Sequence, residues 1–481
     1  MYYFEAHIRA SMNRRGRRTL LLIARCAAVL AVLIGCPAPA QEAPQTLARE
    51  LLREMIETDT TGEHGDTTPL ANGLAARFRK AGFPAEDVQV LGPQTRHCNL
   101  VVRLRGSGHA RPILVISHLD VVEAKPEDWT VPPFKLTEKD GWLYGRGTQD
   151  IKGEAAAEAA SFIQLKQEGI VPKRDFILAL TTGEEGATFY NGIDWLLNNH
   201  RALIDAEYCL NGDGGGPESE QGRPVFRAFQ ASEKAYYNFA LTVTASGGHS
   251  SLPHPGTAIQ VLARGVARLD DQQPTARLEE TTRSFFRRMA AIEHGEAAAL
   301  MTKAAQWDTN AIATLSKDPE WNAKLHTTWV TTLIQGGHAT NALPQRAAAI
   351  VNCRMLPCDD ILDIQRQLTN ALAEPRIEVR LMGRPRPSPA SPLREDVLAA
   401  VERSTEAVWP GCPVVPAMEN GATDGTYLRR AGIPTYGIGG IPVDRDDVRA
   451  HGKDERIRVK DFEAGVKTFT LLLRDLAAQE R

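Results

Sequence analysis

The sequence predicts an α/β protein with a large, doubly wound and mostly parallel sheet, into which a smaller ferredoxin-like α+β unit is inserted. Short apolar runs alternate with amphipathic helical segments early in the chain and again at its end, which is typical of a parallel sheet with helices on both faces. Around residue 232 the order changes to β-α-β-β-α-β, that of a split βαβ unit. A chain of 481 residues is also too long for one compact core.

The elements of the large domain follow from periodicity, because helices place apolar residues three or four positions apart and buried strands are short apolar runs. In its first part we expect helices at 46–58, 68–82, 152–168 and 190–199, and strands at 99–105, 112–117, 176–180 and 206–210. In its last part we expect helices at 397–409 and 460–476 and a strand at 435–438.

The inserted unit has its own set of elements. We expect strands at 236–244, 327–334, 347–355 and 376–381, and helices at 257–269 and 360–372. Residues 270–324 form a helical, charged insertion to which no chemistry is assigned. The large domain therefore comprises residues 41–231 and 383–481, and the inserted domain comprises residues 232–382.

Residues 1–40 are predicted to be an export signal. Four arginines between residues 14 and 18 precede the largely apolar stretch 19–35, and small residues follow up to Ala40. The uninterrupted apolar part covers only about ten residues, whereas a bilayer needs about 20. Cleavage after Ala40 and lipid attachment at Cys36, in a sequence that resembles a bacterial lipobox, both stay open. We expect a periplasmic or secreted product that touches a membrane only through a possible lipid anchor.

Composition excludes several classes of protein. Lys and Arg number 56 against 59 Asp and Glu, so no basic field points to nucleic acid. The five cysteines after the leader are odd in number and irregular in spacing, which predicts neither a disulfide framework nor a zinc finger. They are Cys98, Cys209, Cys353, Cys358 and Cys412.

Two adjacent carboxylates, Glu184 and Glu185, directly follow the predicted strand 176–180. In open α/β sheets, ligands bind at the carboxyl ends of the strands. Neighbouring anions repel each other at such an edge unless cations are close. The sequence therefore predicts positive charge, such as metal ions, beside this pair.

Other candidate ligands occupy comparable places, just after a strand or just before a helix. Each has an ordinary explanation as a salt-bridged pair, a helix cap, a turn residue or a surface histidine, but these explanations do not account for their shared edge. His118 and Asp120 are expected to point the same way, so that one binds a metal while the other fixes the imidazole. The candidates are His118, Asp120, Asp150, Asp213 and His451.

Two imidazoles and three carboxylates suit a pair of borderline divalent ions, zinc first, with cobalt or manganese as substitutes. Five ligands cannot complete two tetrahedra unless one carboxylate bridges and water fills the remaining positions. Glu184 is then left over, next to a ligand and free to take a proton from water activated by the ions.

The motifs around these residues resemble those of the M20 metallopeptidases, which include carboxypeptidase G2, succinyl-diaminopimelate desuccinylase, acetylornithine deacetylase, aminoacylase and carnosinase-like dipeptidases. The resemblance covers nearly all of the chain after the leader. It is carried by Ser117-His118-Leu119-Asp120-Val121-Val122, Gly145-Arg146-Gly147 to Gly153, Thr182-Gly183-Glu184-Glu185-Gly186 and Ala450-His451-Gly452-Lys453-Asp454-Glu455.

The resemblance implies a catalytic domain of the di-zinc exopeptidase type and a role for each residue. His118 and Asp213 would bind one zinc ion, and Glu185 and His451 the other. Asp150 would bridge the two ions and Asp120 would orient His118. Glu184 would serve as general base and then as general acid.

The inserted domain resembles the lid and dimerisation domain of that family, which implies a homodimer. The histidine of Ser246-Gly247-Gly248-His249-Ser250-Ser251 would stabilise the oxyanion in the other protomer's site. Asn341 and Arg354 would bind the carboxylate of the substrate, a task that suits the planar guanidinium of arginine. The loop at Gly439 would line the same pocket.

Two positions depart from the desuccinylase-like members. The desuccinylase-like members carry glutamate where this chain has Asp213. The shorter aspartate is more like the carnosinase and aminopeptidase-like branches. The segment 421–426 also lacks the arginine that often follows Thr-Asp-Ala, so carboxylate recognition there is open. Neither departure affects the hydrolytic residues.

We expect a metal-dependent carboxypeptidase or dipeptidase that acts on small peptides. The alternative is hydrolysis of N-acyl amino acids, as in aminoacylases. A non-catalytic binding protein on the same fold is a third interpretation, which the presence of Glu184 disfavours because a binding module would need the ligands but not the base.

Overall fold

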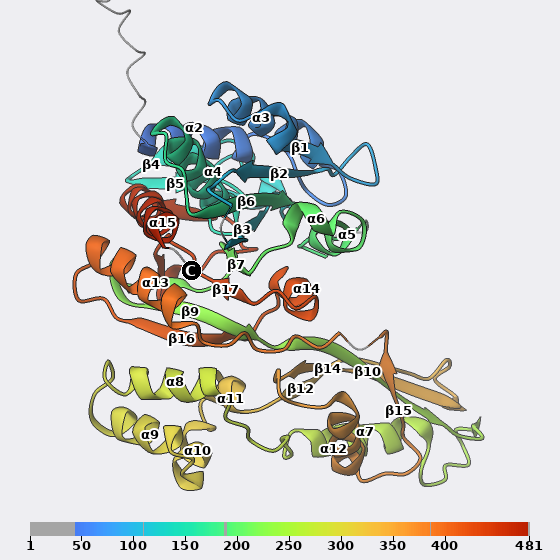
Figure 1. Ribbon diagram of the computed structural model, residues 1–481. Coiled ribbons are helices and arrows are strands. Elements are labelled where there is room, and N and C mark those ends of the chain that lie inside the picture. The colour runs from blue at the N-terminus through green and yellow to red at the C-terminus, as the bar shows by residue number, and fades with distance from the viewer. Residues whose placement is uncertain (1–43, 109, 187–189, 385, 480–481) are drawn as a thin grey trace, which may run out of the picture.

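The computed structural model describes residues 44–108, 110–186, 190–384 and 386–479 (Figure 1). A large domain has helices on both faces of its sheet, and a smaller, elongated domain extends to one side. The predicted export signal, with Cys36 and Ala40, lies outside the described residues. Within the described part of the chain, no helix has the length and apolarity that crossing a membrane would require.

The large domain is built on a ten-stranded mixed sheet in the order β1-β2-β6-β3-β7-β17-β9-β8-β18, with β16 paired to β9. Its centre, β6-β3-β7-β17, is parallel, as the sequence predicts. The strands are β1 (Val88–Leu91), β2 (Asn99–Leu104), β3 (Ala110–His118), β6 (Arg174–Thr181), β7 (Tyr208–Asn211), β8 (Gly216–Glu220), β9 (Arg223–Glu233), β16 (Val414–Glu419), β17 (Thr435–Gly437) and β18 (Val443–Asp444).

Helices cover both faces of this sheet because its central strands are apolar on both sides. In β6, Leu178 and Leu180 pack towards α4, whereas Ile177 and Ala179 pack towards α5. The first face is covered by α2 (Pro44–Ile56), α3 (Thr67–Lys80), α4 (Lys152–Gln167), α13 (Glu395–Val408) and α15 (Val459–Ala478), and the second by α5 (Gly192–Asn199), α6 (Arg201–Ile204) and α14 (Gly425–Arg430).

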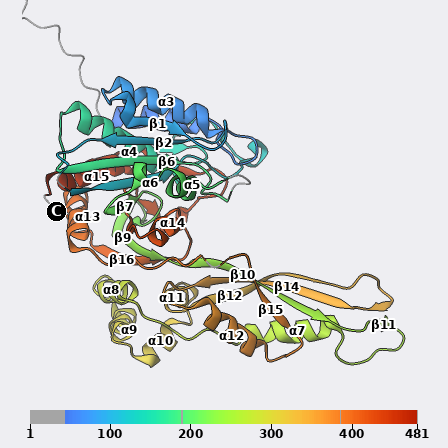
Figure 2. The ribbon, with the colours of Figure 1, turned by 45° about the vertical axis from the view of Figure 1, so that its right-hand side comes forward.

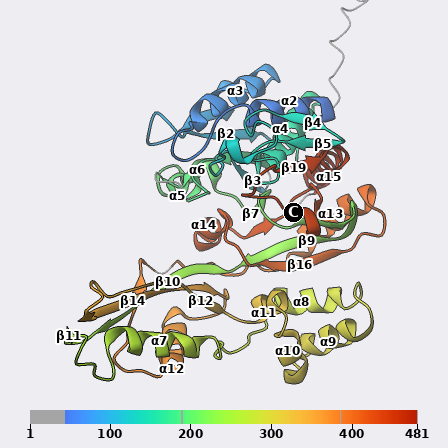
Figure 3. The same cartoon turned by 180° about the vertical axis from the view of Figure 1, so that it is seen from behind.

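The smaller domain has the predicted split βαβ order. Its antiparallel sheet runs β12-β14-β10-β15 and packs with two helices around its own apolar core. The elements are β10 (Ala235–Thr244), α7 (Ala258–Leu269), β12 (Thr328–Gly336), β14 (Arg346–Met355), α12 (Ile361–Leu372) and β15 (Glu378–Met382). The prediction of an α/β protein with an inserted α+β unit is confirmed. Strand β9 leads almost directly into β10, with only Lys234 between them (Figure 3).

The helices of the insertion 270–324 pack on the large sheet. The residues before these helices contact the small domain, where the carbonyl of Gln272 accepts from the indole N–H of Trp329 at 3.0 Å. Phe285 and Phe286 share an apolar cluster with Phe226 of β9 and Val415 of β16, and the helices lie beneath β16 in Figure 3. The insertion contains α8 (Glu280–Met289), α9 (Gly295–Ala305), α10 (Thr309–Leu315) and α11 (Pro319–Leu325). Although it interrupts the inserted domain in sequence, by the packing of its helices it belongs to the large domain.

Short elements complete the structure. There is a three-stranded sheet in the large domain and a two-stranded one at the tip of the small domain (Figure 2). They are formed by β4 (Thr137–Lys139), β5 (Trp142–Tyr144) and β19 (Arg456–Arg458), and by β11 (Gly248–His249) and β13 (Ala342–Leu343), and the 3-10 helices are η1 (Ala85–Asp87), η2 (Pro126–Asp128) and η3 (Arg445–Asp447).

Candidate metal centre and active site

The five candidate ligands converge at the carboxyl edge of the parallel strands. His118 ends β3, Glu185 follows β6, Asp213 follows β7, Asp150 precedes α4 and His451 precedes β19. They form two groups of three whose ligand atoms lie within 4.8 Å of one another, His118 with Asp150 and Asp213, and Asp150 with Glu185 and His451. Asp150 is common to both groups, which is the grouping that the family resemblance implies.

Asp150 presents one carboxylate oxygen to each group. Its Oδ1 lies 3.1 Å from Nε2 of His118, and its Oδ2 lies 3.1 Å from Nε2 of His451. The same nitrogen of His451 is 2.9 Å from Oε2 of Glu185. A carboxylate that faces two imidazoles from its two oxygens has the arrangement required of a bridging ligand.

The protonation of these residues reflects concentrated negative charge. Burial, reinforced by repulsion from Asp150, raises the pKa of Asp213 well above its usual range and that of Glu185 to about 7. The hydrogen bond with Asp150 raises the pKa of His451 to about 9. Protons thus partly balance the charge of the carboxylates, a task that divalent cations perform better.

The donor set fits two divalent ions. It combines two imidazole nitrogens with carboxylate oxygens, and Oε1 of Glu185 is buried with no hydrogen-bond partner among the described residues. Borderline ions such as zinc accept this mixture. His118, Asp150 and Asp213 would hold one ion, and Asp150, Glu185 and His451 the other.

Asp120 contacts His118 through its backbone in this structure. The Nδ1–H of His118 donates to the backbone carbonyl of Asp120 at 2.9 Å, whereas the carboxylate Oδ1 is 3.8 Å away. That carboxylate instead accepts from the backbone N–H groups of Gly183 at 2.7 Å and of Glu185 at 3.2 Å. In this structure the backbone carbonyl of Asp120 binds His118, and the carboxylate positions the loop that carries Glu184 and Glu185. The role of Asp120 in orienting His118 stays a prediction.

Glu455 is a structural partner of the metal centre to which the sequence analysis assigned no role. Its buried carboxylate accepts from the backbone N–H groups of Gly147 at 3.1 Å, Gln149 at 2.7 Å and Asp150 at 3.1 Å. Arg146 donates to it at 2.5 Å. Glu455 thereby joins the Asp150 loop to the His451 loop. The sequence signal for this role was the place of Glu455 four residues after His451, in the same motif.

Comparison with known proteins agrees with this geometry, since residues 114–475 match Peptidase family M20/M25/M40. The chain belongs to this family. It is 28% identical over 383 residues to N-fatty-acyl-amino acid synthase/hydrolase PM20D1 from Xenopus tropicalis, covering 78% of this chain and 74% of that protein. This M20 protein is therefore a hydrolase of the metallopeptidase and amidohydrolase kind.

Solved structures share the fold of this M20 chain. The M20 family metallo-carboxypeptidase Sso-CP2 from Sulfolobus solfataricus superimposes with a TM-score of 0.65 at 19% identity, covering 89% of this chain and 99% of that one. YXEP from Bacillus subtilis, described as a dinuclear metal-binding peptidase of the M20 family, has a TM-score of 0.56 at 13% identity, covering 90% and 98%.

Glu184, the expected base of this M20 site, belongs to neither ligand group and lines a cavity of about 250 Å³. Burial, with repulsion from Asp213, raises the pKa of Glu184 well above its usual range. The cavity also contains Asp424, Tyr236 and Arg386. Glu184 therefore faces the space between the large domain and the start of the lid.

Arg354 lies close to this cavity, because its guanidinium stacks 4.8 Å over the ring of Tyr236. Arg386, which lines the cavity, makes no ion pair among the described residues, and its guanidinium donates to the hydroxyl of Tyr427 at 3.4 Å. Two guanidinium groups thus stand near the mouth of the space that Glu184 faces.

Gly439 lines a second cavity, of about 200 Å³, together with Asp150 and Asp213. Gly439 therefore lies beside the metal centre, in a cavity other than the one that Glu184 and Tyr236 line. Its expected place in one pocket with Asn341 and Arg354 stays a prediction. Part of the wall is apolar, with Ile441 and Val443 among its residues. Among the described residues that line it, none is a lysine or arginine.

His249 and Asn341 are not brought to the metal centre within one protomer. They lie together at the tip of the lid, where the N–H of Ser250 donates to the carbonyl of Asn341 at 3.0 Å. Figure 2 shows β11 at the end of the lid farthest from β7. The side chain of His249 is exposed and contacts Ser251 Oγ at 2.6 Å. The roles of both residues stay predictions that need a second protomer.

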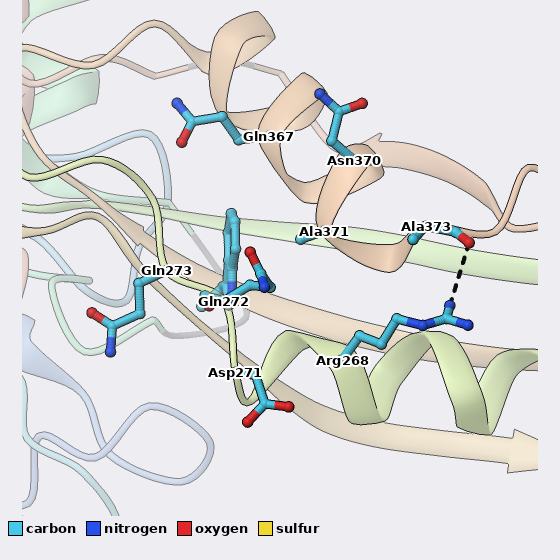
Figure 4. A pocket seen from close by; sticks show the side chains of 9 residues that line it. Arg268, Asp271, Gln272, Gln273, Gln367, Asn370, Ala371 and Ala373 are labelled. Carbon is cyan, nitrogen blue, oxygen red and sulfur yellow. Dashed lines mark hydrogen bonds between the residues drawn. The ribbon is translucent and has the colours of Figure 1, made fainter.

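A cavity of about 440 Å³, larger than either of these, lies on the lid between α7 and α12 (Figure 4). Its walls are mainly polar and exposed, and they include Gln272, Gln367 and Asn370. Arg268 is already occupied there, since it donates to the carbonyl of Leu372 at 2.5 Å. Neither ligand group borders this cavity, and we assign it no chemistry.

Proposed function

We propose that this M20 protein is a carboxypeptidase or dipeptidase that hydrolyses amide bonds of small peptides with two bound divalent ions, zinc first and cobalt or manganese as substitutes. The observation that carries the proposal is the pair of ligand groups that share Asp150, with Glu184 beside them and outside both. A binding module would need the ligands but not a free carboxylate in that place.

The ions, when bound, would polarise the scissile carbonyl and lower the pKa of water. Glu184 takes a proton from the attacking water and returns it to the nitrogen of the leaving amine as the C–N bond breaks. Burial, with repulsion from Asp213, raises the pKa of Glu184, and this makes its carboxylate a stronger proton acceptor. Asp120 holds the backbone of this loop, and therefore the position of Glu184.

Recognition of a free carboxylate on the substrate is assigned to arginines near Glu184. Arg354 is placed by its stacking on Tyr236, and Arg386 lines the same cavity. A guanidinium binds a carboxylate through two parallel hydrogen bonds. Asn341 and the backbone at Gly439 are proposed to assist when the lid of a partner closes.

Hydrolysis of N-acyl amino acids is the second candidate. The cavity beside Asp150 and Asp213 carries Ile441, Val443 and Val448 and no cation among its described lining residues, which favours an apolar group over a charged one. The similarity to N-fatty-acyl-amino acid synthase/hydrolase PM20D1 supports the same candidate.

A homodimer is proposed from the lid. Strand β12 is an edge strand of its sheet, and Val330, Leu333 and Ile334 on it are 58–59% exposed. Exposed apolar edges favour pairing with another strand. In such a dimer His249 would reach the partner's site and stabilise the oxyanion. Mixing His249→Ala with Glu184→Ala protein should restore activity, because a mixed dimer has one site that combines Glu184 of one protomer with His249 of the other. Failure of rescue would contradict the role of His249 in the partner's site.

We propose a periplasmic or secreted location from residues 1–40, with lipid attachment at Cys36 or cleavage after Ala40. Mass spectrometry of the mature amino terminus distinguishes the two. An amino terminus that retains the leader unmodified would contradict both.

The function is tested with a panel of dipeptides and N-acetylated amino acids in the presence of zinc, cobalt or manganese. Glu184→Gln should retain both ions and lose activity by about 10²- to 10⁴-fold. Full turnover by this variant with metal bound would show that the base is misassigned. Metal binding without hydrolysis of any panel member by the wild type would favour the binding-protein interpretation.

A further inference from the structure

The loop 438–441 forms a wall of the cavity beside the metal centre, and its backbone is held mainly by buried charged side chains. Strand β17 ends at Gly437. The N–H groups of Ile438 and Gly439 still donate to the carbonyls of Asn211 and Gly214, at 2.9 and 3.0 Å, whereas side chains bind the carbonyls of these two residues and the next two N–H groups. Gly439 and Ile441 line the same cavity as Asp150 and Asp213. A glycine-containing loop without a side-chain anchor would sample many conformations.

Arg227, on β9, holds the carbonyl groups of this loop. Its side chain is fully buried, and it donates from Nη2 to the carbonyl of Ile438 at 2.5 Å and from Nε to that of Gly439 at 3.1 Å. The remaining nitrogen donates to Thr405 Oγ1 at 3.2 Å. Burial lowers the pKa of Arg227 to about 10, so the group stays charged at neutral pH.

Glu154, in the first turn of α4, holds the N–H groups of the same loop. Its Oε1 accepts from the backbone N–H groups of Gly440 and Ile441, both at 2.7 Å. Glu154 is buried and also lines the cavity. It lies four residues after Asp150, so the residue that ties down the loop and the shared metal ligand sit at the start of one helix.

These contacts orient successive peptide groups in opposite ways, with carbonyls turned to the guanidinium of Arg227 and N–H groups turned to the carboxyl group of Glu154. Both side chains are buried, and burial raises the pKa of Glu154 to about 7. They satisfy four peptide groups of the loop, which apolar side chains in their place would leave without partners. The arrangement therefore suits a loop whose backbone has to meet a ligand in a fixed position.

We propose that Glu154 and Arg227 are positioning residues that hold the loop 438–441 in register with the metal centre and so set the binding of substrate there. The inference rests on the proposed function, because it assigns this loop to the substrate. Neither residue touches the reacting atoms. Each acts through the backbone of the loop, and Glu154 links that backbone to the helix that begins after Asp150.

The test compares Glu154→Ala with Glu154→Gln, which keeps an acceptor oxygen, and with Ser161→Ala as the control. Ser161 is buried on the same helix, and its hydroxyl is hydrogen-bonded with Thr470 at 2.8 Å, away from the loop. Glu154→Ala should raise KM at least tenfold for the best panel substrate, with metal content unchanged and kcat within about threefold. Glu154→Gln should stay within threefold of the wild-type KM, and Ser161→Ala should lower Tm without changing KM.

Hydrogen exchange provides a readout that needs no turnover. In the metal-loaded protein, Glu154→Ala should speed exchange of the Gly440 and Ile441 amides at least tenfold, whereas Ser161→Ala should leave it unchanged. Wild-type protection in Glu154→Ala would overturn the proposal, as would a KM increase of equal size in Ser161→Ala. A wild-type enzyme that hydrolyses no panel member would instead contradict the proposed function, and the exchange result would still decide the role of Glu154 in holding the loop.

Discussion

Replacing Glu455 by glutamine should weaken metal binding although Glu455 is not a ligand. Its carboxylate gathers the backbone N–H groups of Gly147, Gln149 and Asp150 and the guanidinium of Arg146. Glutamine has nearly the same shape, but it lacks the charge and turns one acceptor oxygen into a donor. The loop that presents Asp150 to both ligand groups would then lose part of its anchor.

The size of the effect follows from the burial of the pair. The side chains of Arg146 and Glu455 are 3% and 0% exposed. Breaking a buried ion pair by removing one charge costs about 3–5 kcal/mol, so the free energy of unfolding should fall by about that amount. Residues that orient a metal ligand typically change metal affinity by about 10- to 100-fold, and we expect a loss in this range for Glu455→Gln.

Calorimetric titration of the metal-free variant with zinc measures the affinity, and thermal unfolding measures stability. Asp444→Asn is the control, because the buried Asp444 forms an ion pair with the partly exposed Arg458 in the same domain and has no hydrogen bond to either ligand loop among the described residues. The control should lose stability and keep its metal affinity. Wild-type zinc affinity in Glu455→Gln, or an equal loss in Asp444→Asn, would refute the reasoning.

Three further outcomes are expected. Arg354→Ala should raise KM at least tenfold for peptides with a free carboxylate and leave the KM of amidated peptides unchanged, because a hydrogen bond to a charged group contributes about 1.5–3 kcal/mol. Steady-state kinetics on matched peptides measures both KM values. An equal increase for both kinds of peptide would contradict this role of Arg354. Burial lowers the pKa of Lys234 to about 7 from 10.5. Since the unfolded chain then binds more protons between these values, this lysine destabilises the fold by about 4 kcal/mol at pH 7 and less as pH rises towards 10. Lys234→Met should therefore raise Tm at pH 7 and flatten its rise with pH, and an unchanged profile would contradict the burial argument. Asp150→Asn should reduce binding of both ions, as measured by metal content, and retention of one tightly bound ion would show that Asp150 does not bridge.

Three ligands could be predicted because His118, Glu185 and Asp213 lie at the ends of strands that are recognisable as apolar runs, and parallel strands bring their carboxyl ends to one edge. Asp150 and His451 were predicted from the motifs around them. Strand β9 was not predicted, because its sequence does not form such an apolar run. Arg227, Gln230 and Glu233 are fully buried in it, and their partners lie in distant segments, such as Thr405 and Arg429. A buried strand that is satisfied by remote polar groups shows no apolar pattern. Spacing also could not show that His118 contacts the backbone carbonyl of Asp120.

The acidic residues of the site fall into two kinds that the sequence does not distinguish. Asp150, Glu185 and Asp213 face other charged groups and, in the case of Glu185, keep an oxygen without a partner. Asp120, Glu455 and Glu154 instead direct their carboxylates at backbone N–H groups of the surrounding loops. The second kind holds the loops in place by hydrogen bonds that do not involve the ions.

The carboxylates that hold the ligand loops determine how strongly metal binding is coupled to folding. In a zinc finger the ligands come together only with the metal, so removing it unfolds the domain. Here the loops that carry the ligands are fixed by Asp120 and Glu455, and the strands before them belong to a ten-stranded sheet. Ion removal should therefore abolish hydrolysis and lower the free energy of unfolding only by the binding free energy of the ions, while the fold persists. Folding of the protein alone places the ligands before the ions bind. A site that binds its metals without large rearrangement requires this preorganisation.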